Sequence, residues 1–198
     1  MLNTAVVFNG PPNVGKDTLA RLMVPLGFAH REFKSQLYRD TIAFFRVPED
    51  DFMARATDRD RKDVAWPPLS LWIDGRPRMM SPREALIHVS ENVLKPQYGK
   101  DYFGKAMAER CKEEQLDYVA FSDGGFPAEI HTLRQVYKHV FIFMLQRKGC
   151  VWGNDSRDYL RGMAGSFWVE LTDDQPELAI AQVMDILPAT ALPQGLAA

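Results

Sequence analysis

The residues with the clearest chemical signature are in the stretch GPPNVGKDT at positions 10–18. Gly10 and Gly15 bracket four residues, and Lys16 follows directly. A β-branched and aromatic run precedes this stretch, and helically spaced apolar residues follow it, which is the setting that a phosphate-binding loop requires. In such a loop backbone N–H groups favour anions, glycine lets the backbone approach phosphate, and lysine adds positive charge. The pattern predicts a nucleotide-phosphate site rather than a glycine-rich turn that merely opens a helix.

The loop departs from the usual pattern at one position. Ser or Thr usually follows the lysine, whereas here Asp17 follows it and the hydroxyl comes one residue later, at Thr18. The Thr18 hydroxyl could bind phosphate or Mg²⁺, directly or through water. The Asp17 carboxylate could instead bind the acceptor or a bound arginine. We therefore expect Lys16 and Asp17 to act in catalysis and Thr18 to serve the metal.

Asp123 is the next candidate, because it ends an apolar run. Residues 118–122 (YVAFS) predict a buried strand, and open α/β sheets bind ligands at the carboxyl ends of their strands. Asp123 is therefore expected to hold Mg²⁺, directly or through water, or to orient an attacking hydroxyl. The alternative is ordinary turn chemistry, because Asp before Gly-Gly is common in turns.

The polar segment 147–162 carries four basic residues, Arg147, Lys148, Arg157 and Arg161. Guanidinium groups on a mobile lid can neutralise the charge that develops on a transferred phosphoryl group. Arg147 and Arg157 are the lid residues that we expect to act in catalysis. The alternative is that these are solvated surface charges.

A parallel sheet would position these residues. Strands are predicted at 4–9, 118–122, 139–145 and 167–171. They are separated by helices predicted at 17–24, 34–45, 82–94, 101–114, 127–137 and 176–187. Strands that alternate with helices, and that are apolar without alternation, are typical of a helix-covered parallel sheet. The fold class predicted is α/β, a three-layer P-loop NTPase-type domain.

The predicted organisation is a single domain over 1–187. It contains a mostly helical acceptor-side region at about 48–100, in which 64–80 is irregular, and a basic lid at about 147–162. Residues 188–198 are small residues and prolines, and a loose C-terminal tail is expected there.

The composition excludes several classes of protein. The chain has 198 residues, with 24 Lys and Arg against 26 Asp and Glu, so its formal charge is −2. That balance excludes nucleic-acid binding by bulk positive charge, although a local basic groove is compatible with it. Two cysteines make no disulfide scaffold, and the four histidines show no zinc spacing. Neither a membrane span nor a signal peptide is recognised, so a cytoplasmic protein without a membrane partner is expected.

The GKDT form of the loop resembles nucleotide kinases of the nucleoside monophosphate kinase superfamily, especially bacteriophage deoxynucleoside monophosphate kinases. The stretches SPREALIHVSENVLKPQYGKDYFG, FSDGGFPAE and QRKGCVWGNDSRDYL are similar to a phage branch of 5-hydroxymethyluracil DNA kinases. Those enzymes phosphorylate the base hydroxymethyl group in viral DNA before further hypermodification. The resemblance covers most of 4–171 and implies ATP and Mg²⁺ as cofactors, Asp123 as the strand-end acid, and Arg147 and Arg157 in the lid. The donor-phosphate residues that it implies are Gly10, Asn13, Val14, Gly15, Lys16, Asp17 and Thr18.

One turn departs from the phage monophosphate kinases, which carry an arginine just after this acid in an Asp-Val-Arg-Phe type turn. Here the turn is Asp123-Gly124-Gly125-Phe126. Such an arginine would grip the phosphate of a free monophosphate, so its absence favours a DNA acceptor. The two glycines are expected to leave space for a large or flipped nucleotide.

Two acceptors therefore remain open, modified DNA as the leading one and a free deoxynucleoside monophosphate as the other. Candidate phosphate contacts are Arg55, Arg59, Arg61 and Lys62, or Arg76, Arg78 and Arg83. Candidate base-stacking residues are Trp66, Trp72 and Tyr98, with core packing as their alternative. A regulatory nucleotide switch is disfavoured because no NKxD motif is present. The oligomeric state is left open, a homodimer included.

Overall fold

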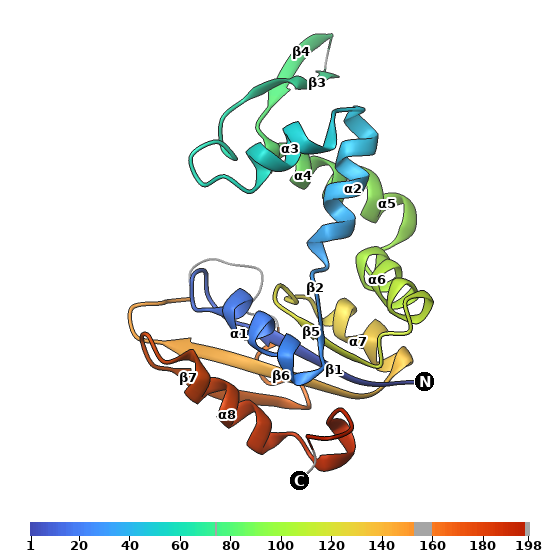
Figure 1. Ribbon diagram of the computed structural model, residues 1–198. Coiled ribbons are helices and arrows are strands. Elements are labelled where there is room, and N and C mark those ends of the chain that lie inside the picture. Colours follow the sequence, from blue (N-terminus) through green and yellow to red (C-terminus); the bar gives the residue numbers. More distant parts are fainter. Residues whose placement is uncertain (74, 153–159, 197–198) are drawn as a thin grey trace. The chain divides into compact units, whose positions relative to one another are not determined.

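The computed structural model describes residues 1–73, 75–152 and 160–196 (Figure 1). The chain forms two compact units, one of Met1–Phe33 with Gly104–Ala198 and the other of Lys34–Phe103. The region predicted at 48–100 as part of one domain thus lies in a unit that also includes the helix predicted at 34–45. Among the described residues, no helix has the length and apolar character needed to cross a bilayer.

The first unit is built on a five-stranded sheet whose neighbouring strands are all parallel. Its strands are β1 (Leu2–Asn9), β2 (Ala29–Arg31), β5 (Tyr118–Phe121), β6 (Tyr137–Arg147) and β7 (Ser166–Leu171). Their spatial order is β2-β5-β1-β6-β7. The four predicted strands are present, and the short β2 is an addition.

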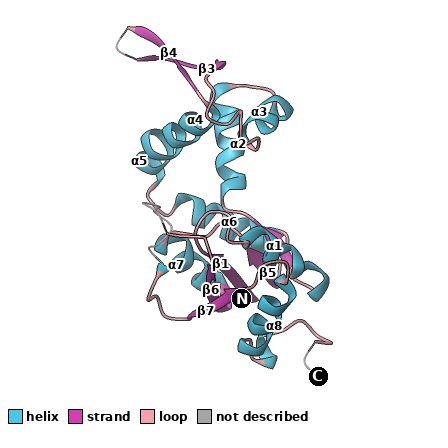
Figure 2. Cartoon of the chain, turned by 90° about the vertical axis from the view of Figure 1, so that its left-hand side faces the viewer, coloured by secondary structure: helices cyan, strands magenta, loops and turns pink. Residues whose placement is uncertain are grey.

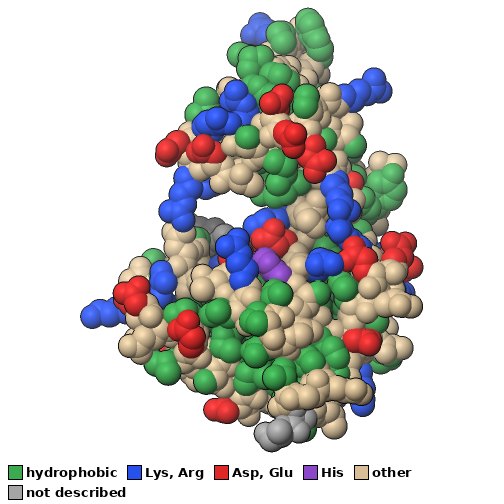
Figure 3. Space-filling view, in the orientation of Figure 1, with side chains coloured by type: hydrophobic (Ala, Val, Ile, Leu, Met, Phe, Trp, Pro, Cys, Tyr) green, Lys and Arg blue, Asp and Glu red, His purple; other side chains and the backbone are tan. Residues whose placement is uncertain are grey.

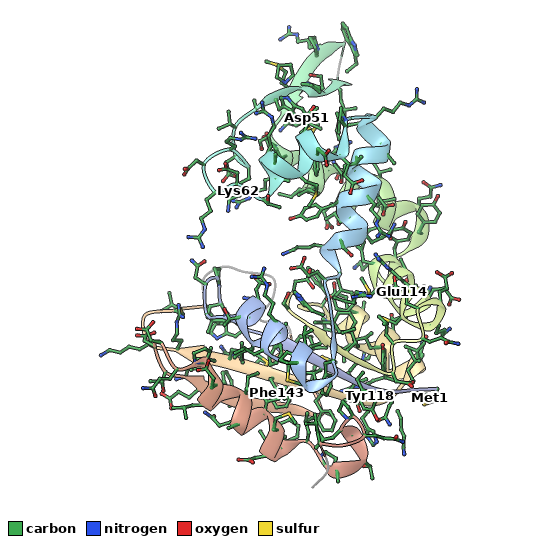
Figure 4. All side chains as sticks on the ribbon, in the orientation of Figure 1. Met1, Asp51, Lys62, Glu114, Tyr118 and Phe143 are labelled. Carbon is green, nitrogen blue, oxygen red and sulfur yellow. The ribbon has the colours of Figure 1, made fainter. Side chains whose placement is uncertain are left out.

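Helices cover both faces of this sheet, as predicted. The helices of this unit are α1 (Lys16–Leu22), the 3₁₀ turn η1 (Val24–Leu26), α6 (Tyr102–Glu113), α7 (Pro127–Val136), α8 (Pro176–Ile186) and the 3₁₀ turn η4 (Ala189–Ala191). Alternate residues of a strand point to opposite faces. Val7 accordingly packs with α6 and α7, whereas Val6 packs with α1, α8 and Phe143 of β6. Phe143 is labelled in Figure 4. The structure is therefore a three-layer α/β arrangement.

Part of the C-terminal segment is packed where a loose tail was predicted, although 188–190 and 194–196 are exposed. Ala191 in η4 is fully buried, and the partly buried Leu192 packs on the cluster that contains α1 and α8. Small residues and prolines suggested a solvated tail, but burial of these apolar side chains outweighs that tendency.

The second unit combines helices with a β-hairpin. Its elements are α2 (Lys34–Phe45), α3 (Glu49–Ala56), β3 (Trp66–Ile73), β4 (Arg76–Met80), α4 (Pro82–His88), the π-helix η2 (Val89–Leu94) and α5 (Lys95–Tyr98). The capping box expected at the start of α4 is present, with Ser81 and Glu84 bonding each other's backbone N–H. Its core contains Phe52, Leu69 and Met80.

The hairpin corrects the prediction of an irregular segment at 64–80. Figure 2 shows β3 and β4 as a strand pair that extends from the helices of this unit. The strands are antiparallel, with a register shift between Trp66 and Ser70. The prolines at 67, 68 and 77 obscured the strand pattern, because proline is confined to sheet edges and bulges. A two-stranded ribbon with a bulge accommodates them.

Candidate active site

The glycine-rich loop joins β1 to α1, as predicted, and its backbone requires both flanking glycines. A Cβ on Gly10 would lie 2.8 Å from Val14 Cγ1 and 3.1 Å from the carbonyl oxygen of Leu145. Gly15 has a left-handed φ of 115°, which L side chains rarely adopt. Asn13 is also left-handed, with φ 63°. Close packing at Gly10 and the left-handed backbone of Asn13 and Gly15 therefore hold the loop in a curved conformation.

Lys16 closes this loop. Its side chain is 9% exposed, and its Nζ donates hydrogen bonds of 2.8 Å to the carbonyl oxygens of Gly10 and Pro11. Hydrogen bonds from an ionised donor are about twice as strong as neutral ones. Lys16 thus shapes the loop as well as supplying charge. Asp17 and Thr18 follow on the first turn of α1, and both are exposed.

Asp123 lies at the carboxyl edge of the sheet, as predicted. Residue pairing places Phe121 of β5 opposite Val7 of β1 and Arg31 of β2, so the ends of these three strands are adjacent. The half-buried Asp123 accepts a 2.8 Å hydrogen bond at Oδ1 from the backbone N–H of Phe33. Its carboxylate is therefore oriented by the chain that leaves β2.

The turn after Asp123 corrects the expectation that its glycines leave space for a nucleotide. A Cβ on Gly124 would lie 2.4 Å from Val7 Cγ1, so packing on β1 itself requires glycine. Asn9 Nδ2 donates to the Gly124 carbonyl at 2.9 Å. The Glu129 carboxylate accepts from the N–H groups of Gly125 and Phe126 at 2.9 and 3.0 Å. The turn is therefore closely packed and fixed by hydrogen bonds. Of the two features that suggested a DNA acceptor, only the absence of an arginine from this turn still supports it.

The structure describes part of the basic segment that was predicted as a lid at about 147–162. Arg147 ends β6, where its Nη2 donates to the Asn13 carbonyl at 2.6 Å and its Nε lies 3.7 Å from Asp173 Oδ1. It therefore braces the glycine-rich loop against the loop before α8. Lys148 is exposed, and Arg161 lies over the rings of Trp152 and Trp168 at 5.5 and 5.7 Å. Arg157 lies outside the described residues.

Two residues that sequence reasoning missed lie beside the loop. His30 is the middle residue of β2, and Glu32 follows directly after the strand. Ligand atoms of both lie within 4.8 Å of one another and of an Asp17 ligand atom. Ser122 Oγ lies 3.0 Å from His30 Nε2 and donates to Glu32 Oε1 at 3.3 Å. Figure 3 shows a histidine among acidic and basic side chains on this face of the molecule. A three-residue strand carries too little pattern to reveal this grouping.

The cations and aromatics proposed for the acceptor side have different environments. Three arginines pair with acids: Arg61 with Asp58 at 3.8 Å, Arg78 with Glu84 at 3.6 Å and Arg83 with Asp63 at 3.1 Å. Trp66 is a core residue with Arg55 stacked on its ring at 4.9 Å. Trp72 on the hairpin is 78% exposed, and Arg59 and Arg76 are exposed. Core packing thus explains Trp66 but not Trp72.

Tyr98 belongs to a polar and aromatic cluster within the second unit. It is 53% exposed and stacks on Tyr102 with 5.2 Å between ring centroids. Tyr102 donates from its hydroxyl to Asp40 Oδ2 at 3.2 Å, and Gln36 donates to Asp40 Oδ1 at 2.9 Å. Burial raises the pKa of Asp40 despite these hydrogen bonds.

No protein-family model and no curated protein sequence matches the chain. Among solved structures it is similar to an unliganded sugar kinase from Janibacter sp., at 15% identity and a TM-score of 0.44, over 98% of this chain and 100% of that one. It is also similar to a gluconokinase from Sinorhizobium meliloti, at 12% identity and a TM-score of 0.41, over 92% and 94% of the two chains. Likeness this slight assigns neither activity nor substrate. The parallel sheet with helices on both faces, and the glycine-rich loop after its central strand, make the first unit a three-layer α/β domain of the P-loop NTPase type.

Proposed function

We propose that the chain is an ATP-dependent kinase that transfers the γ-phosphoryl group of ATP to an oxygen of its acceptor, a hydroxyl group in the acceptor that we favour. The observation that carries this proposal is the phosphate loop closed by Lys16. Asp123 supports it from the end of β5, the strand that pairs with β1. In the reaction the acceptor oxygen bonds to phosphorus, ADP leaves, and the acceptor proton passes to a base, for which Asp123 and Asp17 are the candidates.

The residues present fit an ATP–Mg²⁺ donor. The loop at 10–18 would cradle the phosphates through its backbone N–H groups, with Lys16 near the transferred group. Mg²⁺ prefers oxygen ligands, and the Thr18 hydroxyl and the Asp123 carboxylate would hold it, directly or through water. The ion would neutralise charge on the phosphates. Arg147 keeps the loop in shape through Asn13, and Arg157 is proposed to supply a lid guanidinium.

For the acceptor we favour the hydroxymethyl group of 5-hydroxymethyluracil in DNA. The Asp123–Phe126 turn has no arginine for a free 5′-phosphate. On the hairpin, Trp72 is 78% exposed and Arg76 is exposed on the paired strand, in register next to the Trp72–Pro77 pair. A β-ribbon with an exposed aromatic and a cation is suited to a nucleic acid, because the ring can stack on bases and the guanidinium can contact phosphate.

A free deoxynucleoside monophosphate is the second candidate, and one observation favours it. Arg61, Arg78 and Arg83 pair with acidic side chains, which reduces the positive charge that this unit offers to a polyanion. A monophosphate needs only one phosphate contact, whereas DNA binding grows with the number of neutralised phosphates.

The test is phosphoryl transfer from γ-labelled ATP to three acceptors. These are a duplex containing 5-hydroxymethyluracil, the same duplex with thymine, and each free deoxynucleoside monophosphate. We expect label on the hydroxymethyluracil duplex alone. Label in a nucleoside diphosphate, with none on the duplex, would replace the DNA acceptor by the second candidate. If no acceptor is labelled, and ATP neither binds nor turns over, the kinase proposal itself fails.

A further inference from the structure

Three metal-ligating side chains from separate segments meet beside the phosphate loop. They are Asp17 from the first turn of α1, His30 from β2 and Glu32 from the chain after β2. One ligand atom of each lies within 4.8 Å of those of the other two. We propose that these three residues form a binding site for a divalent transition-metal ion, separate from the Mg²⁺ expected with ATP.

The distances suit a single ion after a small adjustment. Carboxylate oxygens and imidazole nitrogens bind such ions at about 2.0–2.2 Å, so two ligands of a tetrahedral ion lie roughly 3.4 Å apart, and two on opposite sides of an octahedral ion roughly 4.2 Å apart. The three ligand atoms lie within 4.8 Å of one another, so contractions of at most roughly 0.6–1.4 Å would bring them to these separations. Asp17 is exposed, so its side chain can rotate toward the other two residues.

Two of the ligands are already oriented by a buried hydroxyl. Ser122 is 1% exposed at the end of β5, and its Oγ lies 3.0 Å from His30 Nε2 and 3.3 Å from Glu32 Oε1. Outer partners of this kind orient metal ligands and typically contribute tenfold or more to metal affinity. Because Ser122 belongs to the sheet, it limits the freedom of His30 and Glu32 before any ion arrives.

The ligand types indicate which ion fits. Two carboxylates and one neutral imidazole balance the charge of a dication. Imidazole suits Zn²⁺ and similar ions, whereas Mg²⁺ demands near-ideal octahedral oxygen coordination and keeps most of its waters. We therefore expect Zn²⁺ and Mn²⁺ to bind here more tightly than Mg²⁺. The Mg²⁺ that accompanies ATP is proposed to bind Thr18 and Asp123. None of the three residues of the present site is therefore one of its ligands.

Metal titration of the nucleotide-free protein tests the site. Free Mn²⁺ is measured by electron paramagnetic resonance, and Zn²⁺ and Mg²⁺ are added as competitors. We expect one tightly bound Mn²⁺ per chain, displaced by Zn²⁺ and not by equimolar Mg²⁺. His30→Gln and Glu32→Gln should each weaken binding at least about tenfold, and Ser122→Ala about tenfold. The matched control is His131→Gln, which changes an exposed histidine outside the cluster and should leave binding unchanged.

The outcomes separate this site from the proposed kinase activity, because no nucleotide or phosphoryl transfer is involved. Circular dichroism of each variant establishes that it folds, and Glu32→Gln gives an independent answer if His30→Gln does not. The proposal is overturned if the wild-type chain binds neither Mn²⁺ nor Zn²⁺. It is equally overturned if the folded variants bind as tightly as the wild type, or if Mg²⁺ competes on equal terms.

Discussion

The two compact units hold their chemical groups in different ways. In the first unit, side chains of the candidate active site bond to main-chain groups: Lys16 to the carbonyls of Gly10 and Pro11, and Asp123 to the N–H of Phe33. In the second unit, most candidate phosphate contacts are exposed side chains, and three of them pair with acids at 3.1–3.8 Å. Groups fixed by the backbone are pre-organised, whereas exposed side chains can rearrange around a partner.

This difference predicts where mutations act. Pre-organised groups contribute most to transition-state stabilisation, so their loss lowers turnover. Exposed cations and aromatics contribute to binding, so their loss raises the KM of the acceptor.

The largest effect is expected for Lys16→Ala. We predict that turnover falls by about 10²–10³-fold or more, because a charge aimed at the transferred group is lost. The loop also loses the two hydrogen bonds of Nζ, so a lower melting temperature is expected as well. Initial rates at saturating ATP measure the first effect and thermal unfolding the second. Lys138→Ala, at an exposed position on β6, is the control. Near-normal turnover in Lys16→Ala would remove the basis of the phosphate-loop assignment.

Asp123→Asn should be next in size. Asparagine keeps an oxygen that can accept from the Phe33 N–H, but it removes the negative charge. We predict that turnover falls far more than ATP affinity, because a carboxylate that holds metal-bound water or orients the acceptor acts mainly in the transition state. Steady-state rates and direct ATP-binding titrations give the two values, with the exposed Asp185→Asn as control. Weaker ATP binding at unchanged turnover would make Asp123 a ground-state ligand instead.

On the hairpin, smaller effects are expected, and they should fall on acceptor binding. Trp72→Ala should raise the KM for the modified duplex about tenfold, since stacking on one base is worth about 1–3 kcal/mol. Arg76→Glu should raise it by roughly the same factor, because a cation that contacts phosphate is replaced by a like charge. The KM for ATP should not change. For Arg76→Glu, the slope of log KM against log salt concentration should become shallower by roughly one. Kinetics at several salt concentrations measure both, with Lys138→Glu as control. A loss of turnover without a change in KM would contradict the contrast between the units.

The smallest effect concerns an ion-pair cluster in the first unit, where Glu114 (Figure 4) accepts hydrogen bonds from Arg110 and Arg31. These bonds lower the pKa of Glu114 from 4.5 to about 2. Because folding lowers this pKa, the ionised Glu114 carboxylate stabilises the fold fully at pH values above 4.5, the pKa in the unfolded chain. The contribution is lost as pH falls through about 2. We predict that Glu114→Gln lowers the free energy of unfolding by about 0.2–1 kcal/mol at pH 7, since the pair is partly solvent-screened.

Urea unfolding at pH 7, 4 and 2 measures this contribution. The difference between the wild type and Glu114→Gln should shrink steadily toward pH 2. Glu113→Gln changes the exposed neighbouring acid and should show no such trend. A difference that stays constant with pH would mean that the cluster acts through packing rather than through charge.

Short stretches of sequence were sufficient to predict much of the first unit. Each signal lies within a dozen residues: the strand at 4–9, the spacing of Gly10, Gly15 and Lys16, and the apolar run before Asp123. Apolar runs without alternation also indicated strands buried on both faces. β1 and β5 have that character over most of their length, whereas β7 is exposed at Phe167, Trp168 and Glu170. The capping box of Ser81 and Glu84 was predictable for the same reason, because both partners lie in one turn of helix.

Other features depend on contacts between residues that are distant in the sequence. β2 is a strand only because it pairs with β5, and that pairing brings His30 and Glu32 to Ser122. Gly124 must be glycine because Val7 occupies the space of a Cβ, although the sequence suggested an open turn. The β3–β4 hairpin likewise forms against a proline-rich pattern, with its buried residues packed in the core that contains Phe52. Local propensity is worth a few tenths of a kcal/mol per residue, whereas burial of one large apolar side chain is worth about 1.5–3 kcal/mol, so tertiary packing decides such segments.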